Sequence, residues 1–334
     1  MPAKKHKKII LISIIVLLTI YAVMTATIPP AKEKERTSLV IKSRTSLLQI
    51  AHILKEHGLI RSRPIFMALS LAYGGKLIAG EYELSKDKSM VEIVMMMGRG
   101  ERKIYALKIV EGYNIYNIAE AMESSKIMNG TDFLNLARNK EFLQKAGIFA
   151  DSLEGYLMPD TYHYSKEIEV EHFIEKIVQR TKNLFAQEDI VAEMKRFNFD
   201  IHKTLTLASM IEKEAKSKYE KPLISAVFHN RLNKGMSLDC DPTVIYGLNR
   251  FGSPLSKADL TYYTPYNTYT FAGLPKGPIC SPDKNTILAA LNPAQVDYLY
   301  FVSKNDGTHV FSKDIQEHNG FVSIYQRTKT TKKQ

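Results

Sequence analysis

The sequence predicts an α+β fold of two or three folded units behind one N-terminal apolar helix. A run of 20 residues without a charge, Ile9–Ile28, is long enough for a membrane-spanning helix. Two strand-like runs, Ser38–Lys42 and Ala106–Val110, each precede a pair of amphipathic helical patterns. The 334 residues are 45% hydrophobic and 24% charged, which is ordinary for a globular body with a sizeable core.

The positive charge of the chain is concentrated at its two ends. The net charge is +11, and residues 1–8 and 326–334 together hold eight lysines and arginines without any acid. Removing those eight leaves +3 for the body, so the high isoelectric point describes the tails. The body has neither a basic stripe interleaved with aromatics nor zinc-finger spacing. We therefore expect no nucleic-acid partner.

The apolar run is interpreted as an uncleaved membrane anchor. Twenty residues at 1.5 Å each span about 30 Å, the thickness of a bilayer core. A cleaved signal peptide is the alternative, but its apolar region is shorter, about 7–15 residues, and Met24-Thr25-Ala26 is a poor cleavage site. Four lysines precede the run more densely than the basic residues that follow it, which places the N-terminus in the cytoplasm. We expect a single-pass protein of the cytoplasmic (inner) membrane, with residues 29–334 in the periplasm or extracytoplasmic space.

The segments behind the anchor contain an internal repeat. Pro29-Pro30 ends the anchor helix, and a short polar linker follows. Residues 47–60 then align with residues 115–128 at an offset of 68. Each copy predicts an amphipathic helix, a turn and a second helix that contains Phe66 or Phe133.

The first copy is followed by a third strand-like run, Gly80–Leu84. A strand–helix–helix–strand unit of this size resembles a LysM module, a small fold that grips glycans containing N-acetylglucosamine. The resemblance implies glycan contact, and generic helical packing is the alternative.

The remaining elements are predicted from helical periodicity, prolines and turn residues. An aromatic loop over 152–164 precedes helical stretches at 169–187 and 203–216, and Pro222 suits the first turn of a helix that ends near Leu232. The later elements are helix starts at Asp241-Pro242 and Ser281-Pro282, a hairpin of Tyr298–Ser303 and His309–Ser312 around Asn305-Asp306-Gly307, and a last helix over 315–327.

Two cysteines, Cys240 and Cys280, lie in the body. An even number of cysteines in an oxidising compartment permits one disulfide. Two buried free thiols are equally compatible with the sequence, which does not decide between these states.

The helical stretch at 203–216 holds the best candidate for a reacting group. Its apolar residues recur at a spacing that buries one face of a helix. Glu212 and Glu214 are two positions apart, so their side chains point about 200° apart and only one faces a given cleft. A carboxyl group beside apolar neighbours has a raised pKa and can act as an acid at neutral pH. Periodicity leaves open which of the two does so, and a solvated Glu-Lys-Glu run is the alternative.

Five segments of the body together carry a family resemblance. They are SLEGYLMPDTY (152–162), ASMIEKEA (208–215), VFHNRLNKGMSLDCDPTVIYGL (227–248), YNTYTFAGLPKGPICSP (266–282) and YLYFVSKNDGTHVFSKDIQEHN (298–319). In this order they resemble the endolytic murein transglycosylases, also called the YceG-like family. One such segment would be a weak match, whereas five in order are specific. The resemblance covers about residues 37–327, and the family is similar in having a membrane anchor just before that region.

By this resemblance the essential glutamate of the family falls on Glu212, the first of the two in Glu-Lys-Glu. A lytic transglycosylase uses the C6 hydroxyl of the sugar as nucleophile and leaves a 1,6-anhydro end, so one glutamate can serve first as acid and then as base. Such chemistry requires no metal and no organic cofactor. The resemblance implies further substrate contacts from polar residues of the same segments, namely Glu154, Tyr156, Ser209, Asn230, Arg231, Asp241, Thr243, Tyr266, Asn267, Thr268, Tyr269, Glu317, His318 and Asn319.

Several of these residues have an equally ordinary structural interpretation. Asn230 and Arg231 could lie on a solvated helix face, and Asp241 could cap its helix. The aromatic and amide side chains of Tyr266–Tyr269 suit a sugar site, but tyrosines are often simply packed. His318 is more often a structural hydrogen-bonding residue than a proton carrier.

The resemblance implies a membrane-anchored enzyme that cleaves the MurNAc-GlcNAc β-1,4 bond of nascent peptidoglycan strands and terminates their elongation. Its partners would be the glycan strands, the membrane through residues 9–28 and, as candidates, peptidoglycan synthesis proteins. Two alternatives stay open. One is a hydrolytic muramidase with a second carboxylate such as Asp239, Asp241 or Glu317. The other is a non-catalytic scaffold that binds peptidoglycan.

We thus expect an α+β protein with a transmembrane helix, small LysM-like subdomains and a mixed α/β catalytic domain. The expected boundaries are a cytoplasmic tail (1–8), the transmembrane helix (9–28), a linker (29–37), a LysM-like subdomain (38–102), a second LysM-like repeat packed on the catalytic domain (103–150), the catalytic domain (151–328) and a basic tail (329–334).

Overall fold

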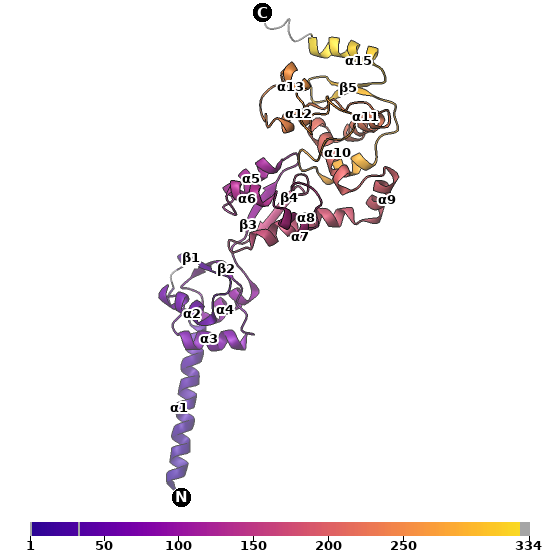
Figure 1. The fold of residues 1–334 in the computed structure, drawn as a ribbon. Helices are drawn as coiled ribbons and strands as arrows, with labels where there is room; N and C mark the ends of the chain where they lie inside the picture. The colour runs from indigo at the N-terminus through magenta and orange to yellow at the C-terminus, as the bar shows by residue number, and fades with distance from the viewer. Residues whose placement is uncertain (1, 33, 328–334) are drawn as a thin grey trace, which may run out of the picture. The chain divides into compact units, whose positions relative to one another are not determined.

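The computed structural model describes residues 2–32 and 34–327, so the basic tail expected over 329–334 lies outside the described residues. The chain combines helices with short strands, as predicted (Figure 1). The chain divides into two compact units. Unit 1 comprises Met1–Ala106 and His163–Glu169, and unit 2 comprises Leu107–Tyr162 and Val170–Gln334.

The apolar run forms the long helix α1 (Pro2–Thr27) of unit 1. Within it, His6–Thr27 is 22 residues long and apolar enough to cross a membrane by length and composition. Its side chains are exposed from Ile9 to Tyr21, which suits a helix that is surrounded by lipid. The helix already begins at Pro2, so the residues expected to form a separate basic tail are its first turns.

The rest of unit 1 is a two-stranded antiparallel sheet with three helices. The elements are β1 (Arg36–Ile41), α2 (Leu47–Glu56), α3 (Arg63–Ala72), β2 (Gly80–Ser85) and α4 (Met90–Arg99). The sheet register runs from Arg36 opposite Ser85 to Ile41 opposite Gly80. The strand–helix–helix–strand order is as predicted, whereas α4 was not predicted and β1 begins inside the expected linker. Capping boxes start α2 and α4, with Ser46 and Ser89 accepting a hydrogen bond from the third residue of each helix.

The internal repeat is matched by burial in the structure. The second copy forms α5 (Ile115–Ser124) and α6 (Gly130–Leu136) after strand β3 (Tyr105–Ile109). The positions aligned at the offset of 68 that are buried in both copies are Ile50 and Ile118, Ala51 and Ala119, and Leu54 and Met122, and the second helix of each copy buries its phenylalanine, Phe66 or Phe133. Both copies therefore bury the same helix face, but the second continues into α7 (Lys140–Lys145) where the first has β2.

Unit 2 holds the later elements of the chain. Strand β4 (Asp160–Tyr164) pairs with β3, and the boundary between the units falls within these two strands. The other elements are α8 (Val170–Phe185), α9 (Glu188–Arg196), α10 (Ile201–Glu214), α11 (Lys221–Asn233), α12 (Asp241–Gly247), α13 (Lys257–Thr261), α14 (Lys284–Leu291), β5 (Tyr300–Ser303), β6 (His309–Ser312), α15 (Ile315–Val322) and the π-helical turn η1 (Ser323–Arg327). The predicted hairpin is confirmed, with Tyr300 opposite Ser312.

Two predicted helix caps are wrong. The residue that precedes α12 is Cys240, and Asp241 is already helical, so Asp241 does not cap. Asp283, rather than Ser281, caps α14 by accepting a hydrogen bond from the N–H of Thr286. The structure also answers the disulfide question, because Cys240 and Cys280 are both buried and free.

Helix α10 lies in the core of unit 2 and positions the site described below. It contacts α11, α12 and α14, and eight consecutive residues, Thr204–Ile211, are buried. Its N-cap Asp200 accepts a hydrogen bond from the N–H of Lys203. The helix ends at Glu214 because the backbone of Ala215 is extended, with φ −78° and ψ 120°.

Candidate active site

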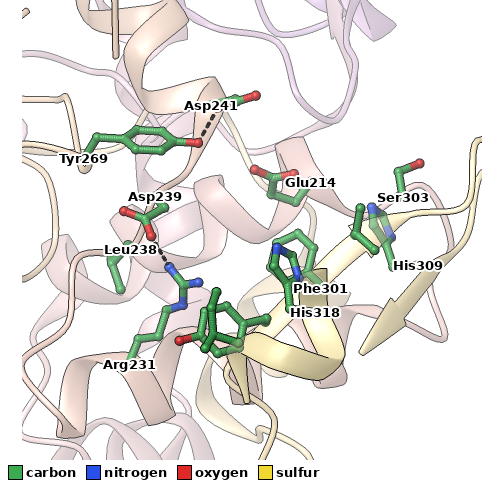
Figure 2. Close-up of a pocket in the computed structure, with 13 residues that line it drawn as sticks. Glu214, Arg231, Leu238, Asp239, Asp241, Tyr269, Phe301, Ser303, His309 and His318 are labelled. Atoms are coloured by element: carbon green, nitrogen blue, oxygen red, sulfur yellow. Dashed lines mark hydrogen bonds and ion pairs between the residues drawn. The ribbon is translucent and has the colours of Figure 1, made fainter. Parts of the chain in front are cut away.

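A pocket of about 420 Å³ lies at the C-terminal end of α10 (Figure 2). Its walls come from α10, α11, the turn before α12 and the start of α12, the segment between α13 and α14, the β5–β6 hairpin and α15. The lining residues, all in unit 2, are Glu214, Arg231, Leu238, Asp239, Asp241, Tyr269, Tyr300, Phe301, Val302, Ser303, His309, Ile315 and His318.

Glu214 is the carboxyl group in this pocket with the most perturbed environment. The thiol of Cys240 donates a hydrogen bond to its Oε1 atom over 3.3 Å. Burial raises the pKa of Glu214 to about 7, the nearby Asp241 adds to the rise, and the Cys240 hydrogen bond opposes it. At neutral pH the group is therefore populated both as an acid and as a base, which suits proton transfer in both directions.

Two further carboxylates in the pocket are already paired. Asp239 Oδ2 lies 2.7 Å from Nη1 of Arg231, and Oδ1 of Asp241 accepts a 2.6 Å hydrogen bond from the Tyr269 hydroxyl. Arg231 is itself fixed, because its Nε donates to the carbonyl of Leu299 and its guanidinium lies 5.0 Å from the centre of the Tyr300 ring. These pairs leave Glu214 as the carboxyl group most able to hold a proton.

His318 adds an aromatic nitrogen group to the pocket wall. Its ring lies 5.1 Å from that of Tyr300. Burial, together with the positive charge of Arg231, lowers the pKa of His318 and so favours the neutral imidazole. Its buried Nδ1 has no hydrogen-bond partner among the described residues, which leaves it able to bond a ligand.

Glu212 lies in a different environment, away from the residues that line this pocket. Its two oxygens lie 3.2 and 3.3 Å from Nζ of Lys221, and Oε2 also accepts from the N–H of Asp283 and from the hydroxyl of Thr286. The side chains of Glu212 and Lys221 are only 6% and 9% exposed. These contacts tie α10 to α11 and α14. Of the two glutamates, Glu214 and not Glu212 lines this pocket, whereas the family resemblance implies that the essential glutamate is Glu212.

A family model described as the YceG-like family matches residues 39–323. The chain belongs to the YceG-like family. A relative from Bacillus subtilis (strain 168), named endolytic murein transglycosylase, is 32% identical over 322 residues, which cover 91% of this chain and 89% of the relative. A relative of the same name from Streptococcus pneumoniae serotype 2 (strain D39 / NCTC 7466) is 27% identical over 97% of this chain and 66% of its own length. The crystal structure of a yceG-like protein from Listeria monocytogenes aligns with a TM-score of 0.61 and 33% identity, covering 86% of this chain and all of that one.

In this YceG-like protein, four of the substrate contacts implied by the resemblance line the Glu214 pocket, namely Arg231, Asp241, Tyr269 and His318. Glu154 and Tyr266 instead line a second cavity of about 200 Å³. Glu154 is buried there and accepts hydrogen bonds from the N–H of Ile115 and the hydroxyl of Tyr246. Burial raises the pKa of Glu154 to about 7, and these two hydrogen bonds oppose the rise.

The other predicted contacts line neither cavity. Asn230 donates to the carbonyls of Val296 and Tyr298, and Asn267 donates to three carbonyls in the segment 259–262. Ser209 accepts from the N–H of Ile279. Their side chains therefore hold loops in place. The hydroxyls of Thr243 and Thr268 form a hydrogen bond with each other, and the hydroxyl of Tyr156 forms one with His202. Glu317 accepts a hydrogen bond from the N–H of Lys313, and Asn319 is exposed on α15.

The sequence analysis missed three aromatic residues of the pocket, Tyr300, Phe301 and His309. All three belong to the predicted hairpin and to the last of the five family segments, which was the available signal. His309 fixes the hairpin, because its Nδ1 lies 2.9 Å from Glu220 at the start of α11. Among the described residues, no cluster of three or more His, Cys, Asp or Glu side chains could hold a metal ion.

Proposed function

We propose that this YceG-like protein is a membrane-anchored lytic transglycosylase that cleaves the MurNAc-GlcNAc β-1,4 bond within peptidoglycan strands. The names of its relatives support this reaction. The single observation that carries it in this chain is the position of Glu214, a carboxyl group whose pKa is raised by burial, at the wall of the pocket. We assign the proton transfer to Glu214 in place of Glu212.

In the proposed reaction, Glu214 gives its proton to the glycosidic oxygen as the bond from that oxygen to C1 of the muramic acid breaks. The C6 hydroxyl oxygen of the same sugar bonds to C1 and passes its proton to the Glu214 carboxylate. The acid form is thereby restored and no water is consumed. A pKa near neutrality serves both steps. The carboxylate of Asp241, close enough to affect Glu214, would stabilise the positive charge that develops on the sugar ring.

The full chain incubated with uncrosslinked glycan strands tests this function by mass spectrometry of the products. We expect shortened strands whose new muramic ends lack one water. Fully reducing ends would show that the reaction is hydrolysis with a second carboxylate and not lytic cleavage. Binding without any shortening would leave only the scaffold function.

For unit 1 we propose LysM-like contact with glycans that contain N-acetylglucosamine. The order β1–α2–α3–β2 supports this proposal. Photo-crosslinking of the full chain carrying Glu214→Gln to peptidoglycan, followed by peptide mapping, tests it. Crosslinks in unit 1 are expected, and crosslinks confined to unit 2 would refute glycan contact by unit 1.

For the anchor we propose that α1 spans the cytoplasmic membrane with its N-terminus inside and both units outside. The apolar length of His6–Thr27 supports the span. Protease added outside intact spheroplasts should digest the body and leave a short N-terminal fragment. A protected full-length body would reverse the topology.

A further inference from the structure

The end of the anchor helix is built into unit 1. Thr25 and Ala26 of α1 are each only 5% exposed, and α1 contacts both α3 and α4. Arg61 donates hydrogen bonds from Nη2 to the carbonyls of Pro29 and Pro30, over 2.8 and 3.3 Å. The N–H of Ala31 donates to the carbonyl of Lys86. Unit 1 therefore cannot swing away from the span, and the surface around the exit of α1 must lie at the bilayer surface.

Helix α3 presents an apolar face to the outside of the protein. Figure 1 shows α3 crossing the end of α1, with β1 and β2 on the opposite side of unit 1. After Arg63, the helix contains no charged residue, and its one hydroxyl, that of Ser70, is buried. Its exposed positions recur at helical spacing and are Pro64, Ala68, Leu71 and Ala72, with Leu71 65% exposed. A helix that is apolar on its buried and on its exposed side fits a membrane contact and not a water-facing surface.

Polar groups that suit lipid head groups frame this face. Tyr73, which ends α3 and is 45% exposed, has the amphipathic ring that membrane interfaces favour. A cavity of about 560 Å³ lies beside the exit of α1. Its floor is Ile28, Pro29, Pro30 and Ala31, and the charged residues that line it, among those that the structure describes, are Lys32, Lys34, Arg61 and Asp87. An apolar floor with an excess of positive charge matches the head group and first carbons of an anionic phospholipid.

We propose that unit 1 docks on the bilayer surface through the apolar face of α3 and binds an anionic phospholipid in the cavity beside the anchor. This inference rests on the proposed span of α1. It adds a second, interfacial contact between the protein and the membrane, on the side from which α1 emerges.

The sequence contains no tryptophan, so one introduced tryptophan reports on its own surroundings. The full chain is reconstituted into nanodiscs whose lipid tails carry bromine, which quenches indole fluorescence on contact. Leu71→Trp tests α3, and Leu17→Trp within α1 reports insertion of the span. Ile104→Trp is the matched control, because Ile104 is 52% exposed. The N–H of its neighbour Lys103 donates to the carbonyl of Glu81 in β2, which lies on the side of unit 1 away from α1 (Figure 1).

We expect Leu71→Trp to be quenched several-fold more than Ile104→Trp. Quenching of Leu17→Trp without quenching of Leu71→Trp would overturn docking and keep the anchor. An unquenched Leu17→Trp would overturn the span itself and, with it, the docking.

Head-group selectivity is tested with an Ile28→Trp chain, because Ile28 lines the cavity, in equimolar phosphatidylglycerol and phosphatidylcholine. We expect stronger quenching when phosphatidylglycerol carries the bromine than when phosphatidylcholine does. Lys32→Gln with Lys34→Gln should abolish this difference. Equal quenching by the two lipids with Lys32 and Lys34 in place would refute an anionic lipid as the occupant of the cavity.

Discussion

Replacing Glu214 and Glu212 separately by glutamine distinguishes the reacting carboxyl group from the structural one. With its pKa raised to about 7 by burial, about half of the Glu214 population holds a proton at pH 7. A carboxyl group with the ordinary pKa of 4.5 would hold a proton in about one molecule in 300 at pH 7. Glu214→Gln removes this acid and keeps the shape, so the rate of anhydro-muropeptide formation should fall by roughly 10²–10⁴-fold while the urea midpoint stays near that of the unsubstituted protein.

Glu212→Gln should have the opposite signature. It removes one partner of an ion pair that is less than a tenth exposed, a change that costs about 3–5 kcal/mol in buried pairs. Because Lys221 keeps Asp283 at 3.2 Å, we expect about 3 kcal/mol of lost unfolding free energy and near-normal turnover of the folded fraction. A folded but inactive Glu212→Gln beside an active Glu214→Gln would refute this assignment and return the acid role to Glu212.

Three further outcomes follow from the same contacts. The rate of glycan cleavage should fall as pH rises through about 7, since the acid form of Glu214 exists below its pKa; a flat profile of kcat/KM between pH 6 and 8 would contradict this. Cys240→Ser replaces a weak thiol donor to Glu214 by a stronger hydroxyl donor, which favours the carboxylate form of Glu214. The fall in rate should therefore move to lower pH, and an unchanged pH profile would exclude this contact. Asn267→Ala removes the amide that donates to three carbonyls, and urea unfolding should show a loss of at least about 1–3 kcal/mol without a change in the pH profile.

The sequence predicted the elements around the site better than the roles of individual side chains. Helix α10, the hairpin and the opposite directions of Glu212 and Glu214 could be predicted from local periodicity. Which carboxyl group faces the pocket could not, because Thr204–Ile211 is enclosed on all sides and its apolar pattern does not define an outer face. The rotation of such a helix is decided by its neighbours, here by Lys221 of α11 on one side.

Asn230 and Asn267 show a second limit of sequence reasoning. Both have the amide character of a sugar-binding residue, yet each donates to backbone carbonyls of a loop. Which loop carbonyls lack a backbone partner depends on tertiary structure, so the sequence pattern cannot separate the two uses of an amide.

The order in which the pocket walls follow one another along the chain has a consequence for biosynthesis. Glu214 is made first, whereas His309, Ile315 and His318 come last among the lining residues. Synthesis proceeds from the N-terminus, so under the topology proposed above Glu214 crosses the membrane before the residues on the opposite side of the pocket. We therefore expect nascent chains that stop before the β5–β6 hairpin to be unable to cleave peptidoglycan. This delay would protect the cell from cleavage of its own murein at sites of export.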